Sequence, residues 1–446
     1  MEGLPKPRRY FAMVALCLGT SLGVLDGYIV SIALPTLSAD LAVRPSEAVL
    51  VVTVYQLGLV MTILPFSALG ERIGLRRLYQ YGQWTFLAAS ILCFLATRLS
   101  FLLCMRFFQA LGAAAALSVA TALIRETYPR RQLGRGLALN NVVVSSSMAA
   151  APVIGGAILS FLSWRYIFML TPPLALLSIW LGRRHLPDPV HRPKPYDVAA
   201  AALCAATLGL TIGGIEAGVH GGHLLLTIPA VLAGLSLGAA FVRRELKSDA
   251  PILPVDLLAH PVIGLAVLAA HLTFIGSSTL MLSLPFRLQA EYGFSPAEVA
   301  AAILPWPLTM IVVAPLAAEL SDRYRAPLLG SIGMVIATVG VCSLALLPRT
   351  LNHWHLAWRM MLVGTGYGMF FSPNARTIVQ LTPAHRVASA GGLISTTRLV
   401  SQTLGATLLA ALLSFGVGAT SVTAWVVAGL TLTSLACNLF RLRISH

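Results

Sequence analysis

Long apolar runs, separated by short polar stretches, extend along almost the whole chain of 446 residues. Each run holds about 20 residues, the length that an α-helix needs to cross a hydrocarbon layer roughly 30 Å thick. Helices are the expected spanning element, because a strand of a membrane barrel needs only about half that length. The pattern therefore predicts an all-α polytopic membrane protein with about fourteen transmembrane helices. The predicted spans lie at residues 11–33, 49–69, 79–97, 100–123, 137–160, 165–182, 197–217, 222–242, 261–286, 296–318, 327–347, 355–375, 388–413 and 420–440.

Composition excludes a set of soluble domains, because apolar residues make up 57% of the chain and charged residues only 11%. In a soluble protein, the formal charge of +15 would indicate a nucleic-acid partner. In a membrane protein, the distribution of Lys and Arg sets the orientation instead, so we expect no nucleic-acid partner. The six cysteines all lie within apolar runs without metal-ligand spacing, and we expect neither a metal nor a cofactor.

The basic residues are unevenly distributed between the two sides of the predicted membrane protein. If the N-terminus is cytoplasmic, the inside loops hold 23 of the 31 Lys and Arg residues. The positive-inside rule then places both termini in the cytoplasm and requires an even number of spans. We expect a multi-pass protein of the cytoplasmic (inner) membrane.

An acid–Arg pair recurs at the end of two runs. Glu71-Arg72 follows the second run, and Asp322-Arg323 follows the tenth. Each pair lies after the second helix of a set of six, and paired six-helix halves around a central cavity are typical of secondary transporters. We therefore predict an N-terminal six-helix half, two inserted helices with their connectors, and a C-terminal six-helix half, at residues 1–196, 197–260 and 261–446.

Asp26 is a carboxylate within the otherwise apolar first run. At about 1.5 Å per residue it lies roughly 22 Å from the start of that run, inside the hydrocarbon layer. An ionisable group at that depth costs several kcal/mol unless it faces a partner or a wet cavity, so it indicates a functional site. The alternative is a packing or capping aspartate near a misplaced helix boundary.

Several short motifs resemble the major facilitator superfamily, and specifically its fourteen-span drug:proton antiporter family. Some positions depart from the family pattern, with Glu71 in place of Asp, Ser67 in place of Gly, Leu75 in place of a basic residue and Ala110 in place of Gly. The resemblance covers essentially the whole chain, and the order and spacing of the motifs make it specific. The motifs lie at residues 25–35, 71–77, 106–112, 151–156, 164–168 and 284–289, with Pro373 and Arg398 further along.

This resemblance implies a secondary active transporter, not an enzyme: a proton-coupled antiporter that exports amphipathic small molecules, such as drugs or antiseptics, by alternating access. Its expected partners are a small-molecule substrate, protons and membrane lipid, and we expect a monomer. The alternative is an exporter of a self-made metabolite, such as a siderophore-like anionic product. The acid-poor interior, with Arg106, Arg398 and His271, favours that alternative.

The resemblance also implies a proton relay at Asp26 and Arg106. Burial disfavours the charged form of a carboxyl group and a nearby guanidinium favours it, so a change of surroundings loads or releases a proton. The alternative is a static ion pair that fixes helix packing. Two further candidates for proton coupling are Glu216 and His271. The alternative for Glu216 is a residue at the membrane interface, and the alternative for His271 is a hydrogen-bonded core residue.

Gating is expected at two places. The loop motifs would hold the inner gate closed by contacts to helix ends. The alternative is that they are solvated loops whose charges only set the orientation in the membrane. The candidates are Glu71, Arg72, Arg76, Asp322 and Arg323. Pro152, Gly155 and Gly156 would form a hinge in the fifth helix, or would serve ordinary close packing.

The predicted substrate cavity combines aromatic rings with two polar groups. Arg398 lies near the middle of the thirteenth run, where it lines the cavity or pairs with backbone carbonyls. The aromatic residues face either the cavity, the lipid or the core. The candidates are Tyr28, Gln109, Phe274, Trp306, Tyr367, Phe370 and Arg398.

Overall fold

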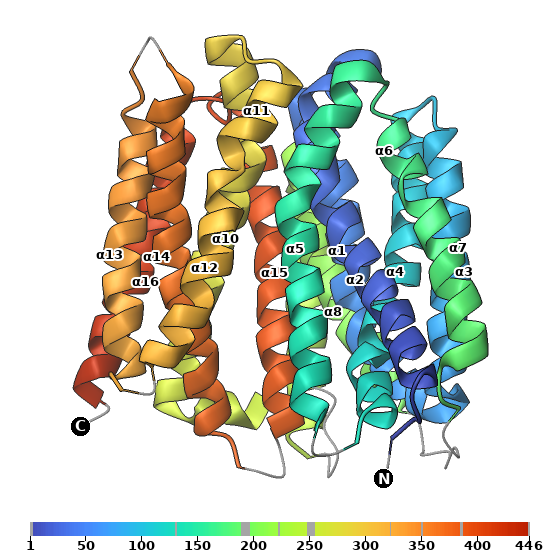
Figure 1. The fold of residues 1–446 in the computed structure, drawn as a ribbon. Helices are drawn as coiled ribbons and strands as arrows, with labels where there is room; N and C mark the ends of the chain where they lie inside the picture. Colours follow the sequence, from blue (N-terminus) through green and yellow to red (C-terminus); the bar gives the residue numbers. More distant parts are fainter. Residues whose placement is uncertain are drawn as a thin grey trace. The chain divides into compact units, whose positions relative to one another are not determined.

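We describe a computed structural model of the chain. It describes residues 3–129, 132–188, 197–221, 224–247, 255–321, 323–348, 351–383 and 387–444. These residues form helices and no strand (Figure 1). Within them, ten helical segments are long and apolar enough to cross a membrane. The prediction of an all-helical polytopic membrane protein is therefore confirmed, whereas the count of fourteen spans stays a prediction.

Contacts between residues divide the chain into two compact units. Unit 1 comprises Met1–Val43, Leu50–Gly214 and Leu225–Phe241, and unit 2 comprises Arg44–Val49, Ile215–Leu224 and Val242–His446. The division into two halves and an inserted helix pair stays a prediction.

The first half of the chain forms nine helices in the described residues. They are α1 (Arg8–Asp40), α2 (Pro45–Ile73), α3 (Leu75–Phe94), α4 (Leu99–Thr127), α5 (Leu133–Phe161), α6 (Tyr166–Met169), α7 (Thr171–His185), α8 (Val198–Gly221) and α9 (Leu224–Glu245).

The remainder begins with the short 3₁₀ helix η2 and continues with seven α-helices in the described part of the chain. They are η2 (Val255–Ala259), α10 (Pro261–Tyr292), α11 (Pro296–Ile303), α12 (Pro305–Leu320), α13 (Ala326–Ala345), α14 (His353–Gln380), α15 (Val387–Ser414) and α16 (Ser421–Ile444).

Two of the predicted spans each consist of two consecutive helices joined by one residue with helical backbone angles. The span at 165–182 is divided into α6 and α7, and the sequence continues after Leu170 with Thr171-Pro172-Pro173. The span at 296–318 is divided into α11 and α12 immediately before Pro305. Proline has no backbone N–H, so each of these prolines removes a hydrogen bond from the helix, while the backbone at Leu170 and Leu304 stays helical.

The two units share one pattern of helix neighbours. In unit 1, α1 packs against α4, α5 and α7, and α3 packs against α4 and α7. In unit 2, α10 packs against α14, α15 and α16, and α13 packs against α14 and α16. The helices α1 and α10 therefore each lie against at least three others, which makes them suitable carriers for buried functional groups.

Glycines permit the closest helix contact in each unit. A Cβ atom on Gly112 of α4 would lie 2.5 Å from the backbone nitrogen of Phe86 and 2.7 Å from the carbonyl oxygen of Gly82, both on α3. In unit 2, a Cβ atom on Gly366 of α14 would lie 2.3 Å from the backbone nitrogen of Ala337 on α13. Small residues let helix backbones approach in this way, and neither contact leaves room for a larger side chain.

Candidate functional site

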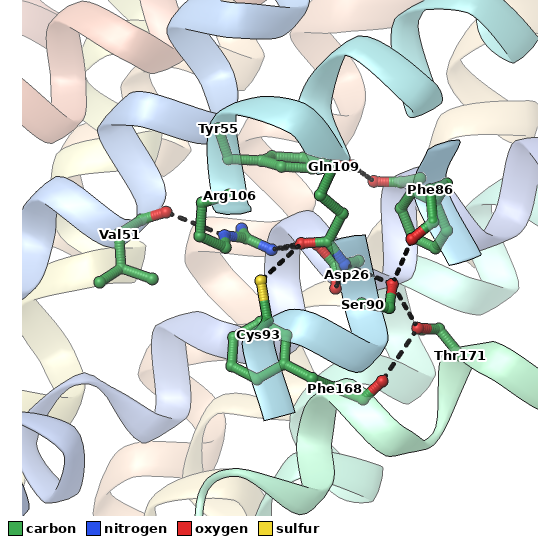
Figure 2. A network of polar contacts seen from close by, with 11 residues as sticks. Asp26, Val51, Tyr55, Phe86, Ser90, Cys93, Arg106, Gln109, Phe168 and Thr171 are labelled. Carbon is green, nitrogen blue, oxygen red and sulfur yellow. Dashed lines mark hydrogen bonds and ion pairs between the residues drawn. The ribbon is translucent and has the colours of Figure 1, made fainter. Parts of the chain in front are cut away.

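Asp26 of α1 and Arg106 of α4 form an ion pair inside unit 1 (Figure 2). Arg106 donates from Nη1 to Oδ2 of Asp26, and both side chains are fully buried. The sequence prediction named these two residues together, as a proton relay or as a static ion pair, and the structure places them in direct contact. Because the contact is closed to solvent, the charge of each group depends on the other.

Gln109 connects this ion pair to α3. Its Nε2 donates to Oδ1 of Asp26 at 3.0 Å and to the Ser90 hydroxyl at 2.8 Å, and its Oε1 accepts from Arg106 Nη1 at 2.6 Å. Both carboxylate oxygens of Asp26 therefore have a donor. We had placed Gln109 in the substrate cavity from its position in the sequence, but it is fully buried within this network.

The spacing of three residues along α4 explains the arrangement. Arg106, Gln109 and Gly112 follow one another at intervals of three and so lie on one face of the helix. Gly112 lets α4 approach α3, and this brings the Gln109 amide within reach of Ser90. Ser90 in turn accepts from the hydroxyl of Thr171 on α7 at 3.2 Å, so four helices contribute to one polar network.

Aromatic rings surround the Arg106 guanidinium. Its Cζ lies 4.2 Å from the centroid of the Tyr55 ring on α2 and 5.6 Å from that of Phe168 on α6. Its Nε donates to the carbonyl oxygen of Val51 at 3.1 Å. A desolvated guanidinium is stabilised by such ring faces. Figure 2 shows Tyr55 and Val51 beside the Arg106 side chain. Neither residue was among the candidates predicted from the sequence.

This arrangement is suited to proton transfer linked to a change of packing. A carboxylate accepts hydrogen bonds only, whereas a protonated carboxyl group can donate one and no longer carries the charge that holds Arg106. Gln109 contains both a donor and an acceptor, so it can bond to either form of Asp26. Protonation would therefore weaken the α1–α4 ion pair without leaving the carboxyl group without a hydrogen-bond partner.

The predicted hinge packs next to this site. Pro152, Gly155 and Gly156 are buried in α5, which lies against α1. A Cβ atom on Gly155 would lie 3.1 Å from Cγ1 of Ile29, which follows Asp26 by three residues on α1. Close packing and a hinge are compatible here, since the same small residues permit both.

The predicted gating residues of unit 1 lie at the junction of α2 and α3. Glu71 and Arg72 are exposed in the last turn of α2 rather than in a loop. Only Gly74 separates the helices, and its φ of 105° is one that other residues rarely adopt. Arg76 donates from Nη2 to the carbonyl oxygen of Arg183, and its Nη1 lies 3.9 Å from Oδ2 of Asp188.

The other gating candidates belong to unit 2. Arg323 is exposed after the end of α12, whereas Asp322 lies outside the described residues. Arg376 of α14 donates to the hydroxyl of Ser321 at 2.8 Å and to the carbonyl oxygen of Ala318 at 3.3 Å. An arginine therefore caps the C-terminal end of α12, where the helix dipole favours a cation.

The two remaining candidates for proton coupling each contact α15. Nδ1 of His271 on α10 lies 2.5 Å from the hydroxyl of Ser401. Glu216 of α8 is buried, and its carboxylate accepts from the hydroxyl of Thr407. Glu216 is thus inside the protein, whereas the sequence alternative placed it at the membrane interface.

Most of the predicted cavity residues belong to unit 2, where their aromatic rings form one connected cluster. Ring contacts join Trp306 to Tyr367, and Phe371 joins Tyr367, Phe370 and Phe274. Phe274 and Arg398 line a cavity in unit 2. Trp306, Tyr367 and Phe370 are buried and do not line it. Tyr28 of α1 is half-buried and belongs to unit 1.

A polar stripe on α16 was missed. Thr431, Ser434, Asn438 and Arg441 recur at helical spacing and are all buried. Arg441 is one of the 23 basic residues assigned above to the inside loops, but its Nη1 donates to Oδ1 of Asn374 on α14 at 2.6 Å. A search for polar residues at intervals of three and four within an apolar run would have found this stripe, because those positions share one helix face.

A family model of the Major Facilitator Superfamily matches residues 16–406 and 266–445. The chain therefore belongs to the major facilitator superfamily and is a multi-pass membrane transporter of small molecules. This confirms the resemblance seen in the motifs.

Relatives among known proteins are transporters or resistance proteins by name. The chain is 40% identical to the uncharacterized transporter YebQ of Escherichia coli (strain K12), over 100% of this chain and 98% of the relative. It is 28% identical to the riboflavin transporter RibZ of Clostridioides difficile (strain 630), over 89% of this chain and 87% of RibZ. It is 27% identical to the methyl viologen resistance protein SmvA of Salmonella typhimurium (strain LT2), over 91% of this chain and 83% of SmvA.

Solved structures share the fold at low sequence identity. The inward-facing, unoccupied structure of a bacterial homologue of the human lysosomal transporter Spinster matches with a TM-score of 0.70 and 16% identity, over 98% of this chain and 99% of that one. The peptide transporter POT in complex with sulfate matches with a TM-score of 0.72 and 17% identity, over 97% of this chain and 94% of that one. At these identities the likeness concerns the fold alone.

Proposed function

We propose that this protein is a proton-coupled antiporter that exports amphipathic small molecules across the cytoplasmic membrane by alternating access. The single observation that carries the proposal is the fully buried ion pair between Asp26 and Arg106, with Gln109 bonded to both. Ionisable groups at membrane depth are rare and mark ion pathways or proton relays. In this proposal the protein has fourteen spans and both termini in the cytoplasm.

Asp26 is the proton carrier in this proposal. In its charged form it holds Arg106 and so ties α1 to α4. When a proton neutralises it, that attraction is lost and the packing of α1 against α4 and α5 is free to change. A transporter needs such a link between the occupancy of an ion site and the choice between two packings. The hinge residues Pro152 and Gly155 lie on the helix that packs beside Asp26.

Export of amphipathic compounds is supported by the names of several relatives. SmvA is a methyl viologen resistance protein, and another relative at 27% identity is a tetracenomycin C resistance and export protein of Streptomyces glaucescens. The alternative, export of a self-made anionic metabolite, uses the same coupling site and differs only in the cargo.

Everted membrane vesicles test the proposal. Vesicles that contain the protein are energised so that their interior is acidic, and candidate substrates from a panel of cationic, neutral and anionic amphipathic compounds are added one at a time. Substrate-induced proton release from the vesicle interior, absent from vesicles without the protein, is the expected result. A substrate that accumulates equally with and without the gradient would contradict proton coupling.

A further inference from the structure

A cavity of about 150 Å³ lies within unit 2, between α10, α14 and α15. For comparison, a protein cavity of roughly 150 Å³ binds one molecule of benzene. The cavity therefore has room for a single aromatic ring, with larger parts of a ligand outside it. Its lining residues are Ala270, Phe274, Phe371, Asn374, Ala375, Ile378, Ile394, Ser395, Thr397 and Arg398.

One wall of this cavity is a pair of stacked rings. The rings of Phe274 on α10 and Phe371 on α14 lie 4.2 Å apart at an angle of 14°. Phe371 is also in ring contact with the buried Tyr367 and Phe370, at 6.0 Å and 5.6 Å, which limits its freedom to move. A fixed, half-buried aromatic surface favours a flat ring over a flexible chain.

The charge of the cavity lining is positive. Arg398 is its ionisable member, and no Asp or Glu lines the cavity. Its side chain is exposed, and no hydrogen bond or ion pair connects it to any residue that the structure describes. A guanidinium offers a planar set of donors that matches a carboxylate in a two-bond geometry. Arg398 is therefore available to an anionic ligand.

A second guanidinium lies behind the lining. Arg441 is 1% exposed and donates to Asn374, which is itself a lining residue and donates from Nδ2 to the carbonyl oxygen of Ala266 at 3.0 Å. A buried cation behind a cavity wall raises the positive potential within the cavity, since little solvent lies between them to screen it.

We propose that this cavity is an aryl-carboxylate subsite, which takes an aromatic ring bearing a carboxylate from the cargo. The ring packs against the stacked pair of Phe274 and Phe371, and the carboxylate bonds to Arg398. This inference rests on the proposed function, because it assigns the chemical class of the exported molecule. It predicts discrimination against a cation on the same ring, which Arg398 repels.

Binding to the full-length protein in lipid nanodiscs, without a proton gradient, tests this subsite. The probes are 4-fluorobenzoate, 4-fluorobenzamide and 4-fluorobenzylammonium, each followed by ¹⁹F NMR. These probes share one ring and differ in charge. We expect 4-fluorobenzoate to bind about tenfold tighter than the neutral amide, in line with a charge-assisted hydrogen bond, and the ammonium compound to bind most weakly. If the ammonium compound binds as tightly as the benzoate, the proposal is wrong, whatever the variants show.

Variants identify the contributing groups. Arg398→Gln should abolish the preference for 4-fluorobenzoate over the amide, and Phe371→Leu should weaken both probes without changing that preference. Arg443→Gln removes an equal charge at an exposed position of α16 and should bind all three probes as the wild type does. Unchanged benzoate binding by a folded Arg398→Gln protein, with its melting temperature retained, would overturn the subsite.

The same measurements separate the subsite from the proposed function. Arg398-dependent benzoate binding in a protein that shows no proton-driven export supports the subsite and overturns the antiporter. Proton-driven export in a protein that shows no preference for the benzoate overturns the subsite alone.

Discussion

Arg106 donates a hydrogen bond from Nη1 to Oδ2 of Asp26, and neither side chain has any exposed surface. A buried pair of this kind is costly to form, because both charges lose their hydration. Asp26 and Arg106 offset that cost with Gln109, the carbonyl oxygen of Val51 and the ring of Tyr55. These contacts stabilise the charged forms of both groups, while Nη2 of Arg106 is buried without a hydrogen-bond partner among the described residues.

The stability of the pair can be tested by removing one charge and then both. Asp26→Asn leaves the Arg106 cation buried without its counter-charge, and loss of one member of a buried pair costs about 3–5 kcal/mol. Addition of Arg106→Gln should recover most of that loss, because no charge then remains in the site. Thermal unfolding of the purified variants measures both effects.

An exposed ion pair provides the matched control. Arg44 and Glu47 interact at 2.9 Å with side chains 64% and 28% exposed. Glu47→Gln should change the free energy of unfolding by less than about 1 kcal/mol, since solvent screens such pairs. A double variant Asp26→Asn/Arg106→Gln that melts no higher than Asp26→Asn alone would show that the ion pair does not account for the loss.

Helix packing beside the site predicts a second effect on stability. Gly112→Ala places a Cβ atom 2.5 Å from the Phe86 backbone, so α3 and α4 must separate, at a cost of about 1–3 kcal/mol. Gly429→Ala on α16 meets no atom within 4 Å, and it should be neutral or stabilising by up to about 1 kcal/mol. Gly112→Ala should therefore lower the melting temperature, whereas Gly429→Ala should leave it unchanged or raise it. Equal shifts in the two variants would contradict the close contact between α3 and α4.

Gating by Glu71 predicts a change of conformational population. If Glu71 helps to hold the cytoplasmic side closed, Glu71→Ala should favour the inward-open state. This population can be followed with one spin label at Tyr81 and one at Leu328, two exposed positions at the predicted cytoplasmic ends of α3 and α13. Electron paramagnetic resonance then measures the distance between the two labels. The long-distance population should grow in Glu71→Ala and stay at the wild-type level in the control Glu319→Ala, which removes another exposed carboxylate. Identical distributions in Glu71→Ala and wild type would exclude the gate.

Much of the architecture could be predicted because membrane helices have a simple physical signature. The length of the apolar runs predicted the helices. The depth of Asp26 within its run marked it as unusual before any contact was known, and the family resemblance pointed to Arg106. The helix boundaries at Leu170 and Leu304 were not predicted, since hydropathy does not register the backbone donor that the following prolines lack.

The contacts of the polar residues were harder to predict. Gln109 was assigned to the cavity, because sequence spacing gives the face of a helix but not the helix that covers it. Arg441 was counted as an orientation charge, because a basic last turn usually extends into water or lipid head groups. Its burial depends on Asn374, which lies 67 residues away in the sequence. A contact between residues so far apart in the sequence becomes visible only in the folded structure.

Proton flux through purified protein in proteoliposomes is the most direct test of the account, with Asp26→Asn and Glu216→Gln measured side by side. Both changes replace a buried carboxylate with its amide of similar shape. The account predicts that Asp26→Asn abolishes substrate-driven proton movement while substrate binding without a gradient survives, and that Glu216→Gln remains coupled. An Asp26→Asn protein that still moves protons at near the wild-type rate, or a Glu216→Gln protein that alone loses coupling, would show that Asp26 is not the carrier.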